Sequence, residues 1–224
     1  VSLGAPHRPV SFTVPTGNFG DIFAGYIAKS MGLPIGQLVV ATNHNDILHR
    51  TLTTGAYTKD TVRPSISPSM DIQVSSNFER ALFDAYGRDG AVVAAQMEDL
   101  KGAGGFTISQ GAIDALRATY ASGRASEAET KSEIARVLEE SQELICPHTA
   151  CGTRVARGFL GDVPMVTLAT AHPAKFPDAV EAATGIRPPL PNRMADLYER
   201  SERVARVPND LAALEDFIRE QRRT

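Results

Sequence analysis

A glycine-rich stretch, VPTGNFGD at residues 14–21, combines residue types that can hold an anion. Gly17 and Gly20 let the backbone turn tightly and approach a ligand, and the Asn18 side chain can also donate. The stretch lies between an apolar run and a helical pattern, where free N–H groups and the helix dipole attract negative charge. We interpret it as a candidate phosphate site. The alternative is a glycine-rich turn that binds nothing.

Two known phosphate-binding patterns do not occur in this stretch. It lacks GxGxxG, so it is no dinucleotide fingerprint, and it lacks GK[ST], so it is no P-loop. Asp21 is unusual beside a phosphate because its carboxylate competes with the anion. It could instead cap the helix that follows.

Other polar residues follow further predicted elements. Asn43, Asn45 and Asp46 come directly after a second apolar run, where α/β sheets place ligands, so they could reach a cofactor or substrate. Ser69 and Asp71, in a later polar segment, could do the same.

Two histidines and two cysteines are weaker candidates. His172 could transfer a proton or contact a ligand, and a structural hydrogen bond at a turn is the alternative. His148, after a proline, is a further possible site residue. Cys146 and Cys151 have the spacing CxxxxC without a second pair, so we predict no metal site and no disulfide framework.

The elements that would position these residues indicate an α/β fold. VSFTV (10–14), a helix at 21–31 and QLVVA (37–41) form one βαβ unit, and VPMVTLAT (163–170) is a further strand. Residues 55–76 are rich in Thr, Ser and Pro and are expected to be irregular. Further helices are predicted at about 77–86, 89–100, 109–121, 126–145, 177–184, 193–204 and 209–222.

This pattern predicts a mostly parallel sheet flanked by helices, and an incomplete one. About eight helices accompany only about three strands, although a parallel sheet needs helices on both faces. Either the sheet is small for 224 residues or its other strands lie in sequence outside this chain. The chain begins with Val and not Met, so we expect it to be part of something longer.

Composition narrows the possible functions. With a net charge of −3 and no Lys/Arg stripe, the chain is not expected to bind nucleic acid. No apolar run is long enough to cross a bilayer, so no membrane association is expected. With only two cysteines, the expected compartment is the cytoplasm.

Six segments, in this order along the chain, resemble the threonine synthases. This family consists of pyridoxal 5'-phosphate-dependent enzymes of fold type II, with the tryptophan-synthase-β-like fold. The segments are PTGNFGD (15–21), AKSMGLPI (28–35), ATNHND (41–46), SPSMDIQVSSNFER (67–80), PHTACG (147–152) and TAHPAKF (170–176). The resemblance implies that residues 1–224 form the C-terminal part of the catalytic domain, with a core at 1–190 and C-terminal helices at 191–224.

The resemblance also implies roles for individual residues. Those expected to hold the cofactor phosphate are Gly17, Asn18, Phe19, Gly20 and Asp21. Thr170 matches the residue whose hydroxyl faces the pyridine nitrogen. A hydroxyl partner, unlike a carboxylate, would leave that nitrogen unprotonated, and so would tune how the cofactor stabilises a carbanion.

Enzymes of this family convert O-phospho-L-homoserine and water to L-threonine and phosphate. One residue that this reaction needs, the Schiff-base lysine, has no counterpart in the matching segments of this chain. The family's Schiff-base lysine lies in a Ser-Phe-Lys-Asp segment well upstream, and none of the lysines here has that neighbourhood. They are Lys29, Lys59, Lys101, Lys131 and Lys175. We therefore identify no catalytic residue in this chain, expect it to be inactive alone, and expect the missing N-terminal half to be its partner.

Two other interpretations remain open at this point. The chain could be a phosphate-binding α/β module with no chemistry of its own. It could also be an interaction fragment that only another chain completes.

Overall fold

The computed structural model describes residues 2–222. The chain divides into two compact units, Val1–Pro189 and Leu190–Thr224. The first unit contains every strand and the candidate site, and each unit is described by itself below.

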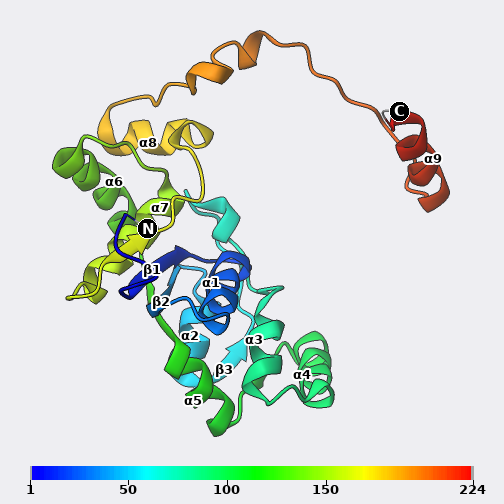
Figure 1. Ribbon diagram of the computed structural model, residues 1–224. Helices are drawn as coiled ribbons and strands as arrows, with labels where there is room; N and C mark the ends of the chain where they lie inside the picture. The colour runs from blue at the N-terminus through cyan, green and yellow to red at the C-terminus, as the bar shows by residue number, and fades with distance from the viewer. Residues whose placement is uncertain (1, 223–224) are drawn as a thin grey trace. The chain divides into compact units, whose positions relative to one another are not determined.

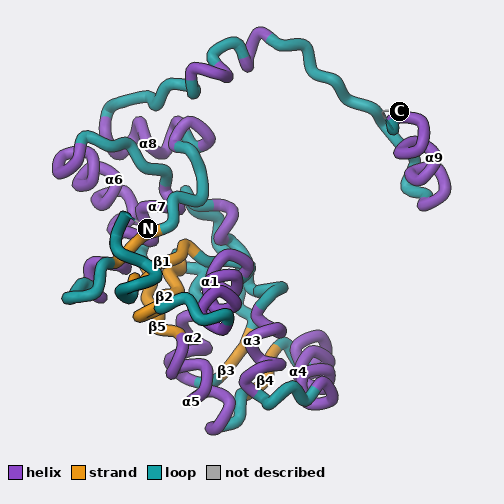
Figure 2. Tube along the Cα trace, viewed as in Figure 1, coloured by secondary structure: helices purple, strands orange, loops and turns teal. Residues whose placement is uncertain are grey.

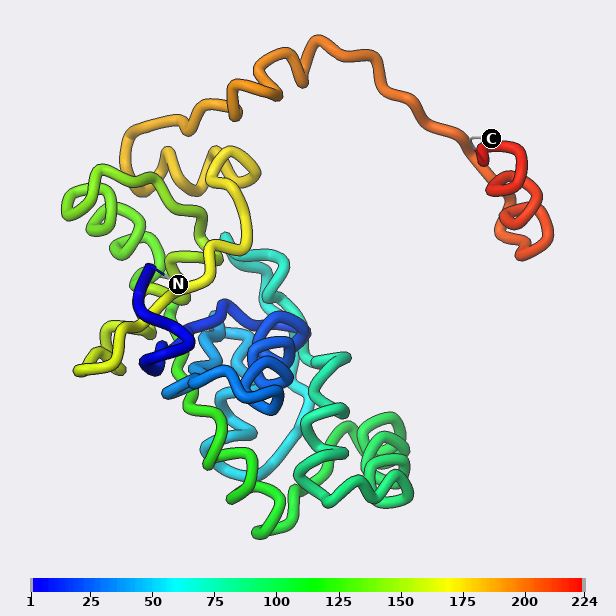
Figure 3. The backbone as a smooth tube through the Cα atoms, viewed as in Figure 1, coloured from blue at the N-terminus to red at the C-terminus, as the bar shows by residue number. Residues whose placement is uncertain are grey.

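A four-stranded parallel sheet forms the centre of the first unit, with strand order β5-β2-β1-β6 (Figures 1 and 2). Its strands are β1 (Val10–Pro15), β2 (Ile35–Thr42), β5 (Tyr120–Arg124) and β6 (Met165–Thr167). The predicted parallel sheet is confirmed, because the three expected strands are neighbours with β1 between β2 and β6. Strands β1 and β6 are far apart in the sequence but pair in this sheet, and Figure 3 shows by colour how the blue N-terminal part of the tube lies beside a yellow part from much later in the chain.

The two faces of the sheet are covered by different helices. Strand side chains alternate between faces, so Leu38 joins the core cluster that includes residues of α1 (Gly20–Ser30). Its neighbour Val39 packs with Val155 of α7 (Pro147–Ala156). The loop after β1 and the start of α7 are thereby held by the same sheet.

The remaining elements of the first unit are mostly helical. The other α-helices are α2 (Ile47–Thr54), α3 (Phe78–Ala85), α4 (Gly90–Gly102), α5 (Gln110–Thr119), α6 (Glu127–Ser141) and α8 (Pro177–Thr184). An antiparallel pair joins β3 (Ala56–Thr58) to β4 (Gly105–Thr107). Short 3₁₀ turns lie at η1 (Pro68–Met70), η2 (Arg157–Phe159) and η3 (Pro173–Lys175).

Several element boundaries differ from the predictions. The helix expected at 109–121 ends at Thr119, because Tyr120 begins β5 and pairs with Leu38 of β2. The strand expected at 163–170 is only Met165–Thr167. The segment 55–76, expected to be irregular, contains β3 and η1.

The second unit contains α9 (Leu211–Gln221) and two 3₁₀ turns, η4 (Asn192–Met194) and η5 (Leu197–Glu199). The helix predicted at 193–204 is wrong, because these two turns replace it. Isolated helices this short are marginal without packing, and residues 199–206 are exposed throughout. Across the described residues 2–222, no helix is both long and apolar enough to span a membrane.

Candidate functional site

The loop between β1 and α1 is anchored by a buried aromatic residue. Phe19 adopts a left-handed backbone conformation, with φ of 67°, directly before the first residue of α1. Its side chain is fully buried, with its ring centroid 5.2 Å from that of Phe78 and 5.1 Å from that of Tyr120, both edge to face. These contacts fix the entry of the chain into α1.

Three successive backbone N–H groups of this loop are free. Those of Gly17, Asn18 and Phe19 have no acceptor among residues 2–222. The Gly20 N–H differs from expectation, because it already donates to Asn18 Oδ1 at 2.8 Å. Asp21 lies in the first turn of α1, exposed, and α1 begins without a side-chain cap. Free N–H groups at the positive end of a helix form an anion site.

The segment after η1 holds the carbonyl groups of the same loop. Ser75 Oγ donates to the Gly17 carbonyl at 2.8 Å, and the backbone and side-chain N–H groups of Asn77 both donate to the Asn18 carbonyl at 3.0 Å. A Cβ on Gly17 would lie 3.0 Å from the Ser69 carbonyl oxygen and 3.2 Å from the Met70 Cα, so a side chain at this position would press on the backbone of that segment.

A pocket of about 150 Å³ opens beside the loop. Its lining residues are Pro15, Gly17, Asn18, Asp21, Ser69, Met70, His148, Thr170, Ala171 and Lys175. Thr170 follows the C-terminal end of β6, which runs parallel to β1. The residues that follow both strands therefore lie at the same end of the sheet. The pocket thus brings together the predicted phosphate loop and the predicted partner of a pyridine nitrogen.

Three of the other predicted site residues form a buried network beside the pocket. Asp71 Oδ1 accepts from the side-chain amides of Asn43, at 2.8 Å, and Asn45, at 2.9 Å. Asn43 also donates to Ser67, at 2.9 Å. None of the three predicted residues lines the pocket. The network holds the segment that leads into Ser69, and Ser69 does line the pocket.

Asp46 and His172 also form polar contacts with other residues of this chain. Asp46 is buried and forms ion pairs with Arg50, at 2.9 Å, and Arg124, at 2.8 Å. His172 is exposed, and its Nδ1 accepts the N–H of Ala174 at 3.1 Å, so it caps η3. Neither residue lines the pocket, and their assignment to substrate remains a prediction.

His148 is the lining residue that sequence reasoning weighted least. It lies in the first turn of α7, and only 3% of it is exposed. Burial, with Lys175 as a second cause, lowers the pKa of His148 to about 4. The signal in the sequence was a histidine directly after the proline that opens a helix, which alone does not distinguish a site residue from a core one.

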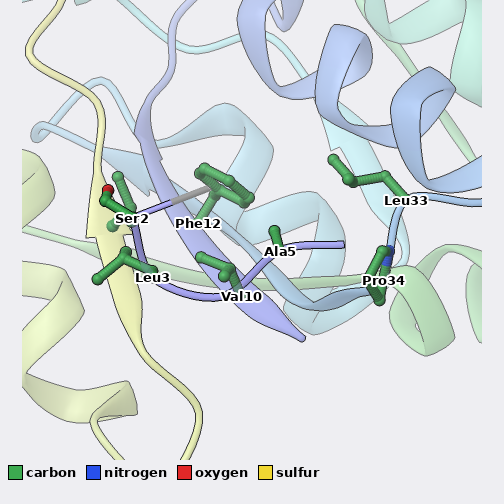
Figure 4. A pocket seen from close by; sticks show the side chains of 8 residues that line it. Ser2, Leu3, Ala5, Val10, Phe12, Leu33 and Pro34 are labelled. Carbon is green, nitrogen blue, oxygen red and sulfur yellow. The ribbon is translucent and has the colours of Figure 1, made fainter. Parts of the chain in front are cut away.

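A second pocket, of about 190 Å³, lies at the opposite end of β1. Figure 4 shows Val10, the first residue of β1, and Phe12 facing side chains from the N-terminal segment and from the residues before β2. Among the described residues its lining contains no charged side chain. Apart from Ser2, its described lining residues are apolar, whereas the pocket beside Gly17 combines backbone donors with His148, Thr170 and Lys175 and is therefore the candidate site.

Known proteins resemble this chain over nearly its full length. The family model "Threonine synthase, C-terminal" matches residues 149–218. Threonine synthase of Pseudomonas aeruginosa is 53% identical, over 97% of this chain and 47% of the relative. The chain therefore spans about half the length of the curated relatives it matches.

Solved structures show the same relationship. The structure of a PLP-bound threonine synthase from Brucella melitensis is 56% identical with a TM-score of 0.91, covering 100% of this chain and 48% of that one. Threonine synthase from yeast is 37% identical with a TM-score of 0.81, covering 95% and 47%. Agreement in sequence and in fold, with the motif segments in order, leads to one assignment: the chain belongs to the threonine synthase family.

Proposed function

We propose that this chain is the C-terminal half of a threonine synthase and binds pyridoxal 5'-phosphate in the pocket beside Gly17. One observation carries the proposal. Gly17 and Asn18, whose backbone N–H groups have no acceptor among residues 2–222, line the same pocket as Thr170, so the proposed phosphate loop and the proposed partner of the ring nitrogen are neighbours.

The residues present fit this cofactor. Residues 17–19 offer three free backbone donors at the N-terminal end of α1, which suit a dianionic phosphate. A Cβ on Gly17 would lie 3.0–3.3 Å from atoms of Ser69, Met70 and Ile72, so a side chain there would crowd the cradle. Asp21 is exposed at the rim, where solvent screens its charge from the phosphate.

When bound, pyridoxal 5'-phosphate supplies an electron-withdrawing ring that stabilises a carbanion on an attached amino acid. The chain's own residues position that ring. The backbone of residues 17–19 would hold the phosphate, and the Thr170 hydroxyl would face the pyridine nitrogen. A neutral hydroxyl does not protonate this nitrogen, so the carbanion chemistry would be tuned differently from that beside a carboxylate.

The proposed reaction is that of a carbon–oxygen lyase in threonine biosynthesis. It converts O-phospho-L-homoserine and water to L-threonine and phosphate, in the cytoplasm. The reaction needs a lysine at the cofactor aldehyde, and Lys175 is the one lysine that lines the pocket among the described residues. Because Lys175 lies on η3 and not in the family's lysine segment, we propose that an N-terminal half supplies the reactive lysine and the rest of the cleft.

Binding of pyridoxamine 5'-phosphate tests the cofactor site without reaction at surface lysines, since this compound lacks the aldehyde. Gly17→Val should weaken its binding to the purified chain by about 10-fold or more, equivalent to at least about 1.4 kcal/mol. The expected reason is that the new side chain collides with the segment 69–72 and distorts the cradle. Isothermal titration calorimetry gives the affinities, and circular dichroism confirms that the variant folds.

Gly158→Val is the matched control, because a Cβ on Gly158 meets nothing within 4 Å and the residue does not line the pocket. Equal affinity of Gly17→Val and Gly158→Val would reject the site. A chain that binds inorganic phosphate but not pyridoxamine 5'-phosphate would support the phosphate-binding module instead.

A further inference from the structure

His148 is built into the pocket by contacts on both sides of its ring. Its Nε2 accepts the backbone N–H of Ser69 at 3.2 Å, and its ring centroid lies 4.6 Å from that of Phe176. His148 and Ser69 both line the pocket. One end of the imidazole is thus tied to the segment that carries Ser69, close to the Gly17 loop.

These contacts determine which nitrogen carries the proton. A backbone N–H can only donate, so Nε2 must present its lone pair, and the single proton of the neutral ring resides on Nδ1. Protonation of Nε2 would break that hydrogen bond. The charged groups that act on the ring are Lys175, which opposes protonation, and Asp71, which favours it to a smaller extent than burial and Lys175 oppose it.

The Nδ1–H group is left without a partner. Nδ1 is buried and has no hydrogen-bond acceptor among residues 2–222. Leaving a buried donor without an acceptor is unfavourable, so a bound ligand that supplies one is favoured. Most of the other polar groups that line the pocket are also donors: the N–H groups of Gly17 and Asn18, the Thr170 hydroxyl and the Lys175 ammonium, with the exposed Asp21 carboxylate as an acceptor. Such a lining suits a ligand rich in acceptor oxygens.

We infer that His148 is a binding residue of this pocket, which donates a hydrogen bond from Nδ1 to an oxygen atom of the bound ligand while Ser69 fixes its tautomer. The identity of that ligand as the cofactor rests on the proposed function. His148 is a fixed donor and not a proton shuttle, because accepting a proton would cost it the hydrogen bond from Ser69.

Nuclear magnetic resonance of the ¹⁵N-labelled chain reads the tautomer directly. In the free protein between pH 6 and 8, His148 should show a protonated Nδ1 and an unprotonated Nε2. Adding pyridoxamine 5'-phosphate should shift the His148 Nδ1 and Hδ1 signals together with the amide signals of residues 17–19. His49, whose Nδ1 lies 2.9 Å from Ser122 Oγ away from the pocket, is the internal control and should not shift.

A parallel titration with inorganic phosphate identifies the acceptor. If phosphate alone shifts the His148 ring signals, the acceptor is a phosphate oxygen; if only pyridoxamine 5'-phosphate shifts them, it is the ring oxygen. Either result supports the inference. An Nε2-protonated ring, or His148 signals that stay unmoved with both ligands, would overturn it.

Variants separate this inference from the proposed function. His148→Phe should weaken binding of pyridoxamine 5'-phosphate by about 10-fold, the loss of one hydrogen bond near 1.4 kcal/mol. His148→Gln keeps an acceptor for Ser69 and a donor for the ligand, so it should recover most of the affinity, and His49→Gln should match the wild type. If Gly17→Val loses binding while His148→Phe and His148→Gln keep it, the inference fails and the cofactor site stands. If the chain binds only phosphate and the His148 signals move, the cofactor proposal fails and the inference stands.

Discussion

At the scale of single residues, His148 links the pocket to the stability of the fold. Its pKa in the folded chain, about 4, is lowered mainly by burial from an ordinary value of 6.5. As the pH falls through 6.5, His148 becomes protonated in the unfolded chain but stays neutral in the folded chain. The contribution of neutral His148 is therefore complete above pH 6.5 and is lost as the pH falls toward 4.

We expect this titration to reduce the free energy of unfolding by roughly 3 kcal/mol between pH 6.5 and 4. The measurement is urea denaturation of the wild type and of His148→Gln at a series of pH values. Carboxylates titrate in both proteins, so the difference between the two curves isolates His148. If both proteins lose stability in parallel over this range, the ring is not held neutral by the fold.

The pocket residues differ in how far the sequence could predict them. Gly17 and Asn18 act through a local turn, so a short motif was enough to point to a phosphate site. The proposed role of His148 depends on Ser69, far away in the sequence, and on the lack of an acceptor for Nδ1 among residues 2–222. Asn43 and Asn45 were predicted from their place after a strand, but the sequence does not show that Asp71 already binds both amides.

At the scale of elements, α6 supports the helix that carries His148. Ile134 of α6 shares a buried cluster with Ala150 of α7, and Arg157 pairs with the buried Glu133 at 2.8 Å. The start of α6 is a capping box, in which Ser126 Oγ accepts the Glu129 N–H at 3.2 Å and Glu129 accepts the Ser126 N–H at 2.9 Å.

Ser126→Ala should lower the free energy of unfolding by about 1 kcal/mol, because the variant leaves one N–H at the start of α6 without its cap. Urea denaturation at neutral pH gives the value. Ser141→Ala is the control at the other end of α6, where the exposed hydroxyl donates to the Val137 carbonyl at 2.7 Å and accepts the N–H of Glu143, beyond the helix, at 3.3 Å. A cap with no energetic role would give two indistinguishable midpoints.

The elements that sequence patterns missed depend on tertiary contacts. Tyr120 continues a helical pattern, yet it pairs with Leu38 and packs on Phe19, so the sheet overrides the local preference. The helix α7 is short and contains Gly152, a residue with low helix propensity. A Cβ at this position would lie 2.6 Å from Thr167, so close packing against β6 explains the glycine, and local helix propensity does not. Strand β1 was predictable from its β-branched and aromatic residues, and β2 from the continuous apolar run at its buried C-terminal part.

At the scale of the whole molecule, the sheet has two edges for a partner to cover. Strand β6 pairs only with β1, and β5 only with β2, among the described residues. Unpaired edges favour association with further strands or with other copies. Together with a chain half as long as its relatives, these edges support the proposal that a second half completes the cleft.

The most direct test of this account is phosphate release from O-phospho-L-homoserine, measured with pyridoxal 5'-phosphate present. The purified chain is assayed alone, and then mixed with the N-terminal half of the Brucella melitensis threonine synthase, a protein 56% identical to it over the shared region. Gly17→Val in the same mixture controls for contaminating phosphatases. The account predicts no turnover by the chain alone and turnover by the mixture that Gly17→Val abolishes. Steady turnover by the chain alone would contradict it, and would make Lys175, the lysine in the pocket, the first residue to replace.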